Sequence, residues 1–147
     1  MKQLKTNHEE ILTLYRYWIW SDRMRVLFDD QLDSAGGRPS PDDMVLEPYW
    51  CYWYGSLYVV IEGWKKLQLS NAKIDGFLGS VNVDLLRVFR NGVFHYQTKW
   101  WDDKFLRFIT QGQDCVRWVR ELHREFGRFF LQQFPRSAKG RATREHC

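Results

Sequence analysis

The sequence contains little cysteine and no long apolar run, and each shortage excludes a class of protein. Its three cysteines, Cys51, Cys115 and Cys147, are too few and too scattered for a disulfide framework, and no CxxC pair occurs. The apolar runs, such as residues 57–61, are far too short to cross a bilayer. Residues 1–6 lead into no apolar segment of the kind found in signal peptides. We therefore expect a cytoplasmic protein without a membrane partner, with Cys51 and Cys115 buried as small apolar residues.

The motifs of several common catalytic sites are also missing. There is no Walker A loop, no GxGxxG and no GxSxG. The four histidines, His8, His95, His123 and His146, lie far apart and lack metal-ligand spacing. We expect neither a metal nor a cofactor, and we expect His123 to be a surface or packing residue.

The positive charge of the chain is concentrated at one end. The formal net charge is +4, but residues 136–147 alone hold four Lys and Arg against one Glu. Residues 1–135 are almost neutral, with 18 Lys and Arg against 17 Asp and Glu. We predict one helical domain over residues 1–135 and a mobile basic tail over 136–147. A nucleic-acid site in the domain would need a local patch of cations.

Aromatic residues are abundant, with 8 Trp, 7 Tyr and 10 Phe among 147 residues. A single small bundle hides less apolar surface than this, and interface cores favour these three residue types. The composition therefore predicts a homodimer.

The apolar periodicity predicts an all-α protein, an up-and-down bundle of four or five helices. Asn7 and Glu10 have the spacing of a capping box, and Gly112 is a point at which the last helical pattern can divide. The expected segments are a helix over 8–32, a loop over 33–48, a helix from 48 or 49 to 69, a short turn over 74–79, a helix from about 82 to 96 or 97, and a helical pattern from about 104 to Pro135.

One predicted helix carries a compact polar cluster, Arg90, Asn91 and His95, on an otherwise apolar pattern. Asn91 and His95 are four residues apart, so an unbroken helix places them one turn apart on one face. Gly92 lies between them, and a glycine inside a helix often marks the close approach of another backbone or a ligand.

Glu62 is the one charge in the middle of the preceding aromatic helix. It is either exposed or in a structural ion pair, or else it holds Arg90 or His95 in place from the neighbouring helix. A purely structural alternative pairs Arg90 with Glu62 or Asp84, while His95 serves a helix end. Trp100 and Trp101 follow this region, and we expect them to be packing anchors rather than base-stacking platforms.

The cluster has the components for RNA cleavage without a metal, in which the ribose 2′-OH attacks its own phosphate. A histidine can accept or return a proton near neutral pH. An arginine can stabilise the charge that develops on the phosphorane, and an asparagine can orient either group. Because the reaction needs both an acid and a base, two chains related by a two-fold axis would supply a fuller set.

The segment Arg90-Asn91-Gly92-Val93-Phe94-His95 resembles the Arg-(four to six residues)-His motif of the HEPN superfamily, in which a polar residue, often Asn, follows the Arg. Residues 86–97 and the preceding segment 59–63 also resemble small bacterial members, and the similarity covers roughly residues 45–100. The resemblance implies a helical bundle that dimerises so that both motifs line one groove.

It further implies a metal-independent endoribonuclease, in a toxin–antitoxin or defence system, with Arg90, Asn91 and His95 as catalytic residues. RNA or a nucleotide, and a cognate antitoxin, are the implied partners. The alternative is a non-catalytic HEPN-like homodimer that binds or scaffolds, because some members have lost catalysis. The nearly neutral domain departs from the cationic lining that an RNA-cleaving groove needs.

Overall fold

The computed structural model describes residues 6–37 and 44–135. These residues form helices and no strand, which confirms the predicted all-α class. The predicted basic tail, with Cys147 and His146, lies outside the described residues. The helices are α1 (His8–Ser34), α2 (Glu47–Lys66), α3 (Ala72–Leu78), α4 (Asn82–Phe94), α5 (Asp103–Gln111) and α6 (Cys115–Gln133).

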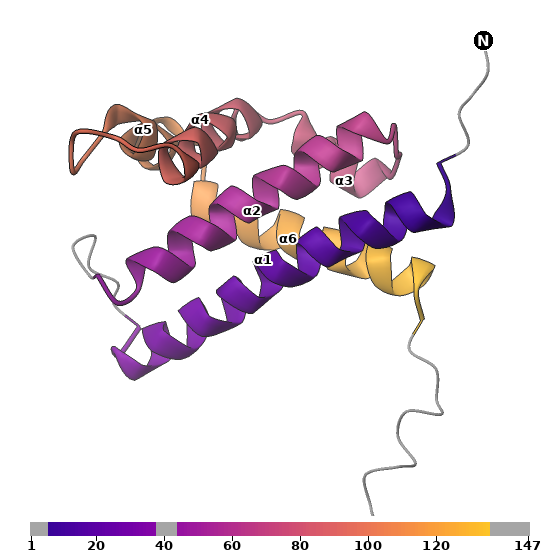
Figure 1. Ribbon diagram of the computed structural model, residues 1–147, viewed down its shortest axis with the longest axis horizontal. Helices are drawn as coiled ribbons and strands as arrows, with labels where there is room; N and C mark the ends of the chain where they lie inside the picture. Colours follow the sequence, from indigo (N-terminus) through magenta and orange to yellow (C-terminus); the bar gives the residue numbers. More distant parts are fainter. Residues whose placement is uncertain (1–5, 38–43, 136–147) are drawn as a thin grey trace, which may run out of the picture.

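The long helices run up and down the bundle, as Figure 1 shows. α1 and α2 lie side by side in opposite directions, and α4 runs back along the other flank of α2. α6 crosses behind α1 and α2. The short helices α3 and α5 form the connections at the two ends of α4. In this arrangement α2 is the central element of the bundle.

The helix ends follow local signals in the sequence. The predicted capping box is present at α1, because Asn7 Oδ1 accepts from the Glu10 amide at 2.8 Å and Glu10 Oε2 accepts from the Asn7 amide at 3.0 Å. Gly112 ends α5 and so separates it from α6. Ser80, not Asn82, supplies a side-chain oxygen at the start of α4, where it accepts from the Asn82 amide at 3.1 Å.

Asn82 instead joins α4 to the α5–α6 turn. Its side chain donates to the Gln113 carbonyl and accepts from the Gln113 amide, each at 2.8 Å. The Asn82 side chain is fully buried, so both bonds replace water that folding removes.

The core is built around the apolar stripe of α2 and is rich in aromatic rings. Aromatic side chains from four helices are almost completely buried, and burial of each contributes roughly 1.5–3 kcal/mol. These are Trp53 and Trp64 of α2, Phe89 of α4, Phe108 of α5, and Phe126 and Phe130 of α6. Cys51 and Cys115 are buried as predicted, and burial raises the pKa of the Cys51 thiol to about 12. Within the described ranges, no helix is both long and apolar enough to cross a membrane.

Candidate functional site

The predicted helix that carries Arg90, Asn91 and His95 is shorter than the periodicity indicated. α4 ends at Phe94, and His95 has an extended backbone with φ −120° and ψ 134°. The His95 amide still donates to the Asn91 carbonyl at 3.1 Å. Because the helix stops there, Asn91 and His95 do not continue a common helical face. Tyr96, which continues the apolar spacing of this segment in the sequence, is 92% exposed.

Arg90 makes three contacts, of which two are with α2 and one is with its neighbour Asn91. Its Nη1 donates to Glu62 Oε2 at 3.1 Å, and its Nε donates to Asn91 Oδ1 at 3.1 Å. Its guanidinium also lies 4.8 Å from the ring centre of Tyr58. Tyr58 and Glu62 are one turn apart on α2, so a single face of that helix positions the guanidinium. Burial and the charge of Glu62 raise the pKa of Tyr58 above its ordinary value.

Glu62 therefore pairs with Arg90, which was one of the alternatives that the sequence left open. Asp84 pairs with Arg87 instead. The Arg90 side chain is 23% exposed and that of Glu62 57%, so the pair lies at the surface and contributes at most about 1 kcal/mol to stability. Arg90 keeps donors beyond these bonds, since no hydrogen bond of its Nη2 to a described residue is present.

His95 is exposed beside a hollow of about 480 Å³ between the end of α4 and the start of α5. Its carbonyl accepts from Gln97 Nε2 at 2.8 Å, and Gln97 Oε1 accepts from Lys104 Nζ at 3.2 Å. The His95 imidazole makes no polar contact with the described residues. Arg90 does not line this hollow, so one chain brings Arg90 and Asn91 together but leaves the His95 ring in separate surroundings.

Gly92 permits the close packing at this site. A Cβ atom at Gly92 would lie 3.1 Å from Lys104 Cβ and 3.4 Å from the Phe105 ring. The predicted close approach at this glycine is therefore made by α5. Phe105 and Lys104 in turn bring α5 against the segment that carries His95.

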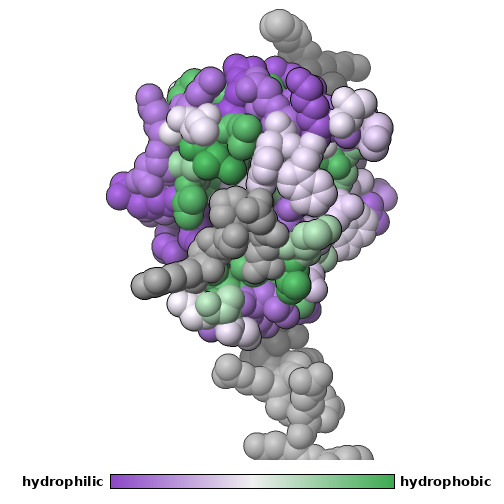
Figure 2. All heavy atoms as spheres, turned by 90° about the vertical axis from the view of Figure 1, so that its left-hand side faces the viewer, coloured by the Kyte–Doolittle hydropathy of each residue, from purple (hydrophilic) through white to green (hydrophobic). Residues whose placement is uncertain are grey.

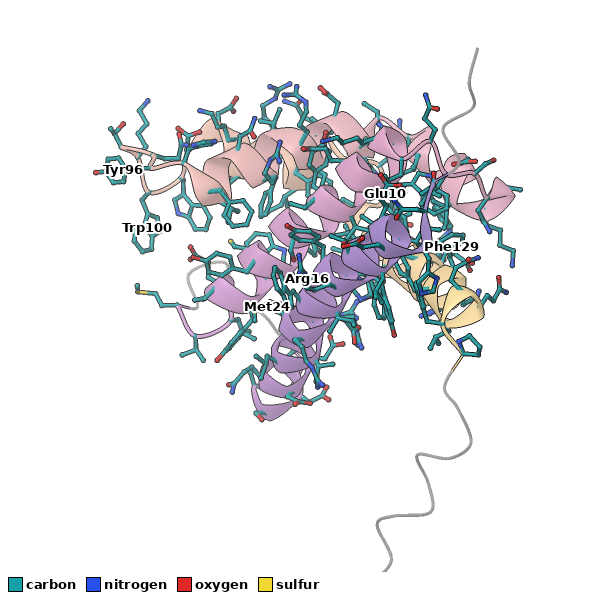
Figure 3. All side chains as sticks on the ribbon, turned by 45° about the vertical axis from the view of Figure 1, so that its right-hand side comes forward. Glu10, Arg16, Met24, Tyr96, Trp100 and Phe129 are labelled. Atoms are coloured by element: carbon teal, nitrogen blue, oxygen red, sulfur yellow. The ribbon has the colours of Figure 1, made fainter. Side chains whose placement is uncertain are left out.

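Exposed aromatic side chains surround the end of α4. Phe94 and Tyr52 are each about half exposed, and their ring centres are 5.8 Å apart. Trp100 is 59% exposed, so the expectation that it anchors packing is wrong. Figure 3 shows Tyr96 and Trp100 projecting from the α4–α5 connection at one end of the molecule. Figure 2 looks onto that end and shows apolar side chains among hydrophilic ones.

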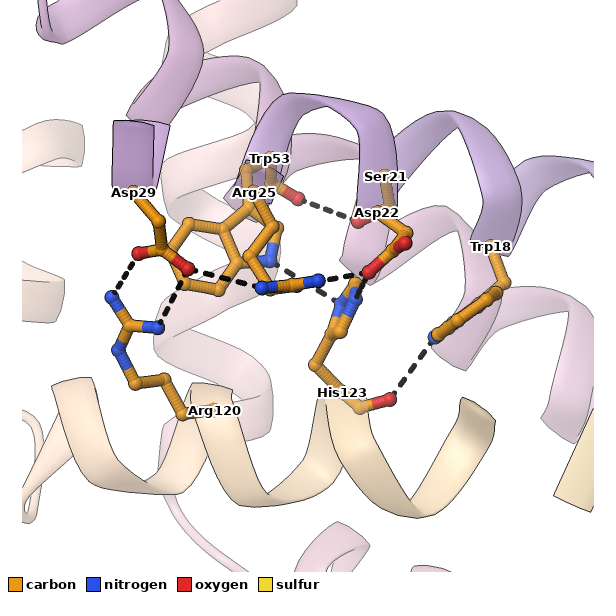
Figure 4. A network of polar contacts seen from close by, with 8 residues as sticks. All are labelled: Trp18, Ser21, Asp22, Arg25, Asp29, Trp53, Arg120 and His123. Carbon is orange, nitrogen blue, oxygen red and sulfur yellow. Dashed lines mark hydrogen bonds and ion pairs between the residues drawn. The ribbon is translucent and has the colours of Figure 1, made fainter. Parts of the chain in front are cut away.

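A second polar cluster, which the sequence did not reveal, joins α1 to α2 and α6 (Figure 4). His123 is almost completely buried, and its Nδ1 accepts from Trp53 Nε1 at 3.3 Å. The ring proton is therefore on Nε2, which donates to Asp22 Oδ1 at 2.9 Å. Burial lowers the pKa of His123 more than Asp22 raises it, so this histidine is neutral. Of the two roles expected for His123, surface or packing, the structure shows the packing one, and His123 also takes part in a polar network.

Two arginines extend the network on the solvent side. Arg25 donates to Asp22 at 2.9 Å and to Asp29 at 3.0 Å, and Arg120 of α6 donates to both oxygens of Asp29. Burial opposes ionisation of Asp22 and Asp29, but their hydrogen bonds outweigh it and the pKa of each is lowered. Asp22, Arg25 and Asp29 occur at i, i+3 and i+7, so they lie on one face of α1. This spacing does not identify the α6 residues that Asp22 and Asp29 contact.

Comparisons with protein-family models, with curated proteins and with solved structures gave no match to this chain. In residues 6–37 and 44–135, no group of three or more His, Cys, Asp and Glu side chains has the arrangement of a metal site.

Proposed function

We propose that this protein is an RNA-cleaving homodimer of the HEPN type, with the ends of two α4 helices forming one catalytic groove. The observation that carries the proposal is the contrast at the end of α4. Arg90 is fixed by Glu62, Asn91 and Tyr58, while His95, five residues later, is exposed. A fixed cation and an exposed imidazole, which the dimer would bring into one groove, suit phosphodiester cleavage, in which one group stabilises charge and the other moves a proton.

In this proposal the His95 ring of one protomer accepts the proton of the ribose 2′-OH, whose oxygen attacks the adjacent phosphorus. The bond from phosphorus to the 5′-oxygen breaks, and the leaving oxygen takes a proton from the His95 ring of the partner. The products are a 2′,3′-cyclic phosphate and a 5′-hydroxyl. Arg90 stabilises the phosphorane through its remaining donors, and Asn91 orients Arg90 by the hydrogen bond to Nε.

The exposed aromatic side chains near the motif support the dimer. Tyr52 of α2 and Phe94 of α4 are each about half exposed, and their rings are in contact. Large apolar side chains are enriched at the cores of protein interfaces. A two-fold contact here would bring a second motif toward the first and would cover these rings.

The test is cleavage of a single-stranded RNA in the presence of EDTA by the wild type, His95→Ala and Arg90→Ala. We expect cyclic-phosphate products from the wild type, a loss of at least about a hundredfold in each variant, and dimers of all three by light scattering. Toxicity on expression should fall in parallel with cleavage. Cleavage that persists in His95→Ala, or a wild type that remains a 17.8 kDa monomer at micromolar concentration, would refute the proposal.

A non-catalytic homodimeric binding protein is the second candidate, and a specific contact favours it. Glu62 neutralises Arg90, and within one chain the His95 ring does not share a hollow with Arg90. A wild type that dimerises and binds RNA, a nucleotide or an antitoxin protein without cleaving RNA would select this function.

A further inference from the structure

The groove between α1 and α6 contains a concentration of arginine that the proposed function does not use. A hollow of about 390 Å³ is lined by Arg25 of α1 and by Arg120, Arg124 and Arg128 of α6. The last three are four residues apart in sequence, so they follow one side of α6 at intervals of about 6 Å. The domain is nearly neutral overall, and this is the kind of local patch that a binding site for anions requires.

Two of these arginines are fixed in place by ion pairs with acids of α1. Arg25 donates to both Asp22 and Asp29, and Arg120 donates to Asp29 from two nitrogens (Figure 4). Asp22 is also covered by His123, whose Nε2 donates to it. The two carboxylates are therefore occupied by several donors each, and they repel an incoming anion less than free carboxylates would.

The other two arginines are directed to solvent. Arg124 is exposed and has no carboxylate within 4.0 Å in the part of the chain that the structure describes. Arg128 pairs with Glu125, but its side chain is 55% exposed whereas that of Glu125 is 14% exposed. Arg124 and Arg128 therefore supply the positive charge of this hollow that is most accessible to a ligand.

An apolar wall completes the hollow. Trp18 and Leu131 line it beside the arginines. The Trp18 ring is fixed because its Nε1 donates to the His123 carbonyl at 3.0 Å and because it packs on Gly127, where a Cβ would lie 2.7 Å from the ring. A site with cations on one side and an apolar edge on the other suits a ligand that joins a phosphate to an organic group.

We propose that this hollow binds a phosphate ester, with Arg124 and Arg128 contacting the phosphate oxygens and Trp18 contacting the attached sugar or base. Guanidinium groups match phosphate geometry with paired donors, and several that converge favour a phosphate over a singly charged carboxylate. The ester is either a free nucleoside monophosphate or a phosphodiester of single-stranded RNA. This site is separate from Arg90 and His95, so the inference does not rest on the proposed cleavage.

The experiment measures binding of a fluorescein-labelled, 2′-O-methylated single-stranded RNA by fluorescence anisotropy. The 2′-O-methyl groups prevent attack by the 2′-oxygen, so binding is observed whether or not the protein cleaves RNA. The test variant is Arg124→Gln/Arg128→Gln. The matched control, Lys73→Gln/Arg107→Gln, removes two surface cations from α3 and α5, outside the hollow.

We expect the test variant to weaken binding at least about tenfold and the control less than about twofold. The slope of log K against log salt should fall by roughly 1.4 in the test variant, because each lost phosphate contact on a single strand contributes about 0.7. Circular dichroism should show unchanged thermal unfolding for both variants, since all four side chains lie at the surface.

Competition identifies the source of the phosphate. Displacement of the RNA by a nucleoside monophosphate, with inorganic phosphate much weaker, assigns the free nucleotide. Displacement only by unlabelled RNA assigns the phosphodiester. Undetectable binding of both RNA and nucleoside monophosphate to the wild type, equal weakening in the test variant and the control, or unchanged binding in the test variant would each overturn the proposal.

Discussion

Two regions of this protein combine the same kinds of side chain in opposite ways. Between α1 and α6, His123 and Asp22 are joined with Trp53 in a network whose imidazole nitrogens both have hydrogen-bond partners. At the end of α4, Arg90 has partners but the His95 ring is exposed and makes no polar contact with the described residues. In this protein His123 is a structural element because both of its ring nitrogens have partners, whereas the exposed ring of His95 is a candidate for proton transfer.

The largest expected difference between the two regions is in stability. Substitution His123→Ala should lower the free energy of unfolding by about 3 kcal/mol or more, because it leaves a cavity and removes a hydrogen-bond partner from both Trp53 and Asp22. Substitution His95→Ala should change it by less than about 0.5 kcal/mol, because that side chain is exposed. Urea denaturation of both variants measures the difference, and equal losses would contradict the distinction.

The second expected difference concerns pH. Because burial lowers the pKa of His123 below its ordinary 6.5, the folded state resists protonation that the unfolded state accepts. Stability from this group is complete above pH 6.5 and is lost as the pH falls toward the lowered pKa. The free energy of unfolding should therefore fall as the pH is lowered below 6.5.

The two acids of the network, Asp22 and Asp29, change the stability of the protein only at lower pH. The pKa of Asp22 and of Asp29 is lowered from 3.8, so their contribution is present above that value and is lost only below it. His123→Gln should reduce the decline that begins at pH 6.5. Denaturation midpoints measured across this range test the assignment, and an undiminished decline in His123→Gln would be evidence against it.

The smallest expected effect sharpens the comparison at the end of α4. Substitution Glu62→Gln keeps a hydrogen-bond acceptor for Arg90 but removes the neutralising charge, so stability should change by less than about 1 kcal/mol. Under the proposed cleavage, the KM for RNA should fall by roughly threefold, because the guanidinium attracts phosphate more strongly. Steady-state kinetics of Glu62→Gln and the wild type measure this change in KM. A KM that rises would show that Glu62 is needed to place Arg90.

Local signals in the sequence predicted most of the helical boundaries. The capping box at Asn7, the break at Gly112 and the apolar stripe of α2 all depend on residues a few positions apart, and each occurs where the pattern indicated. The end of α4 was misjudged because the apolar periodicity continued past Phe94 to Tyr96. Periodicity records which residues are apolar, but it does not record that the chain turns away at His95.

Local spacing in the sequence also identified part of the candidate site. The spacing of Arg90, Asn91 and His95 identified the cluster. The sequence pattern alone also located these residues near the end of a helix, without tertiary information. The choice between Glu62 and Asp84 as the partner of Arg90 did need it, because 28 residues separate Glu62 from Arg90. The His123 network was missed because its bonds join residues 70 and 101 positions apart.

The sequence by itself determined the all-α class, the placement of the long helices and the two buried cysteines, since apolar spacing, caps and helix breakers act over a few residues. Only the tertiary structure decided that the His123 ring is buried with both nitrogens hydrogen-bonded and that the His95 ring is exposed. The free energy of a charged or polar side chain depends on what surrounds it, and in this protein those surroundings come from α2 for Arg90 and from α1 and α2 for His123.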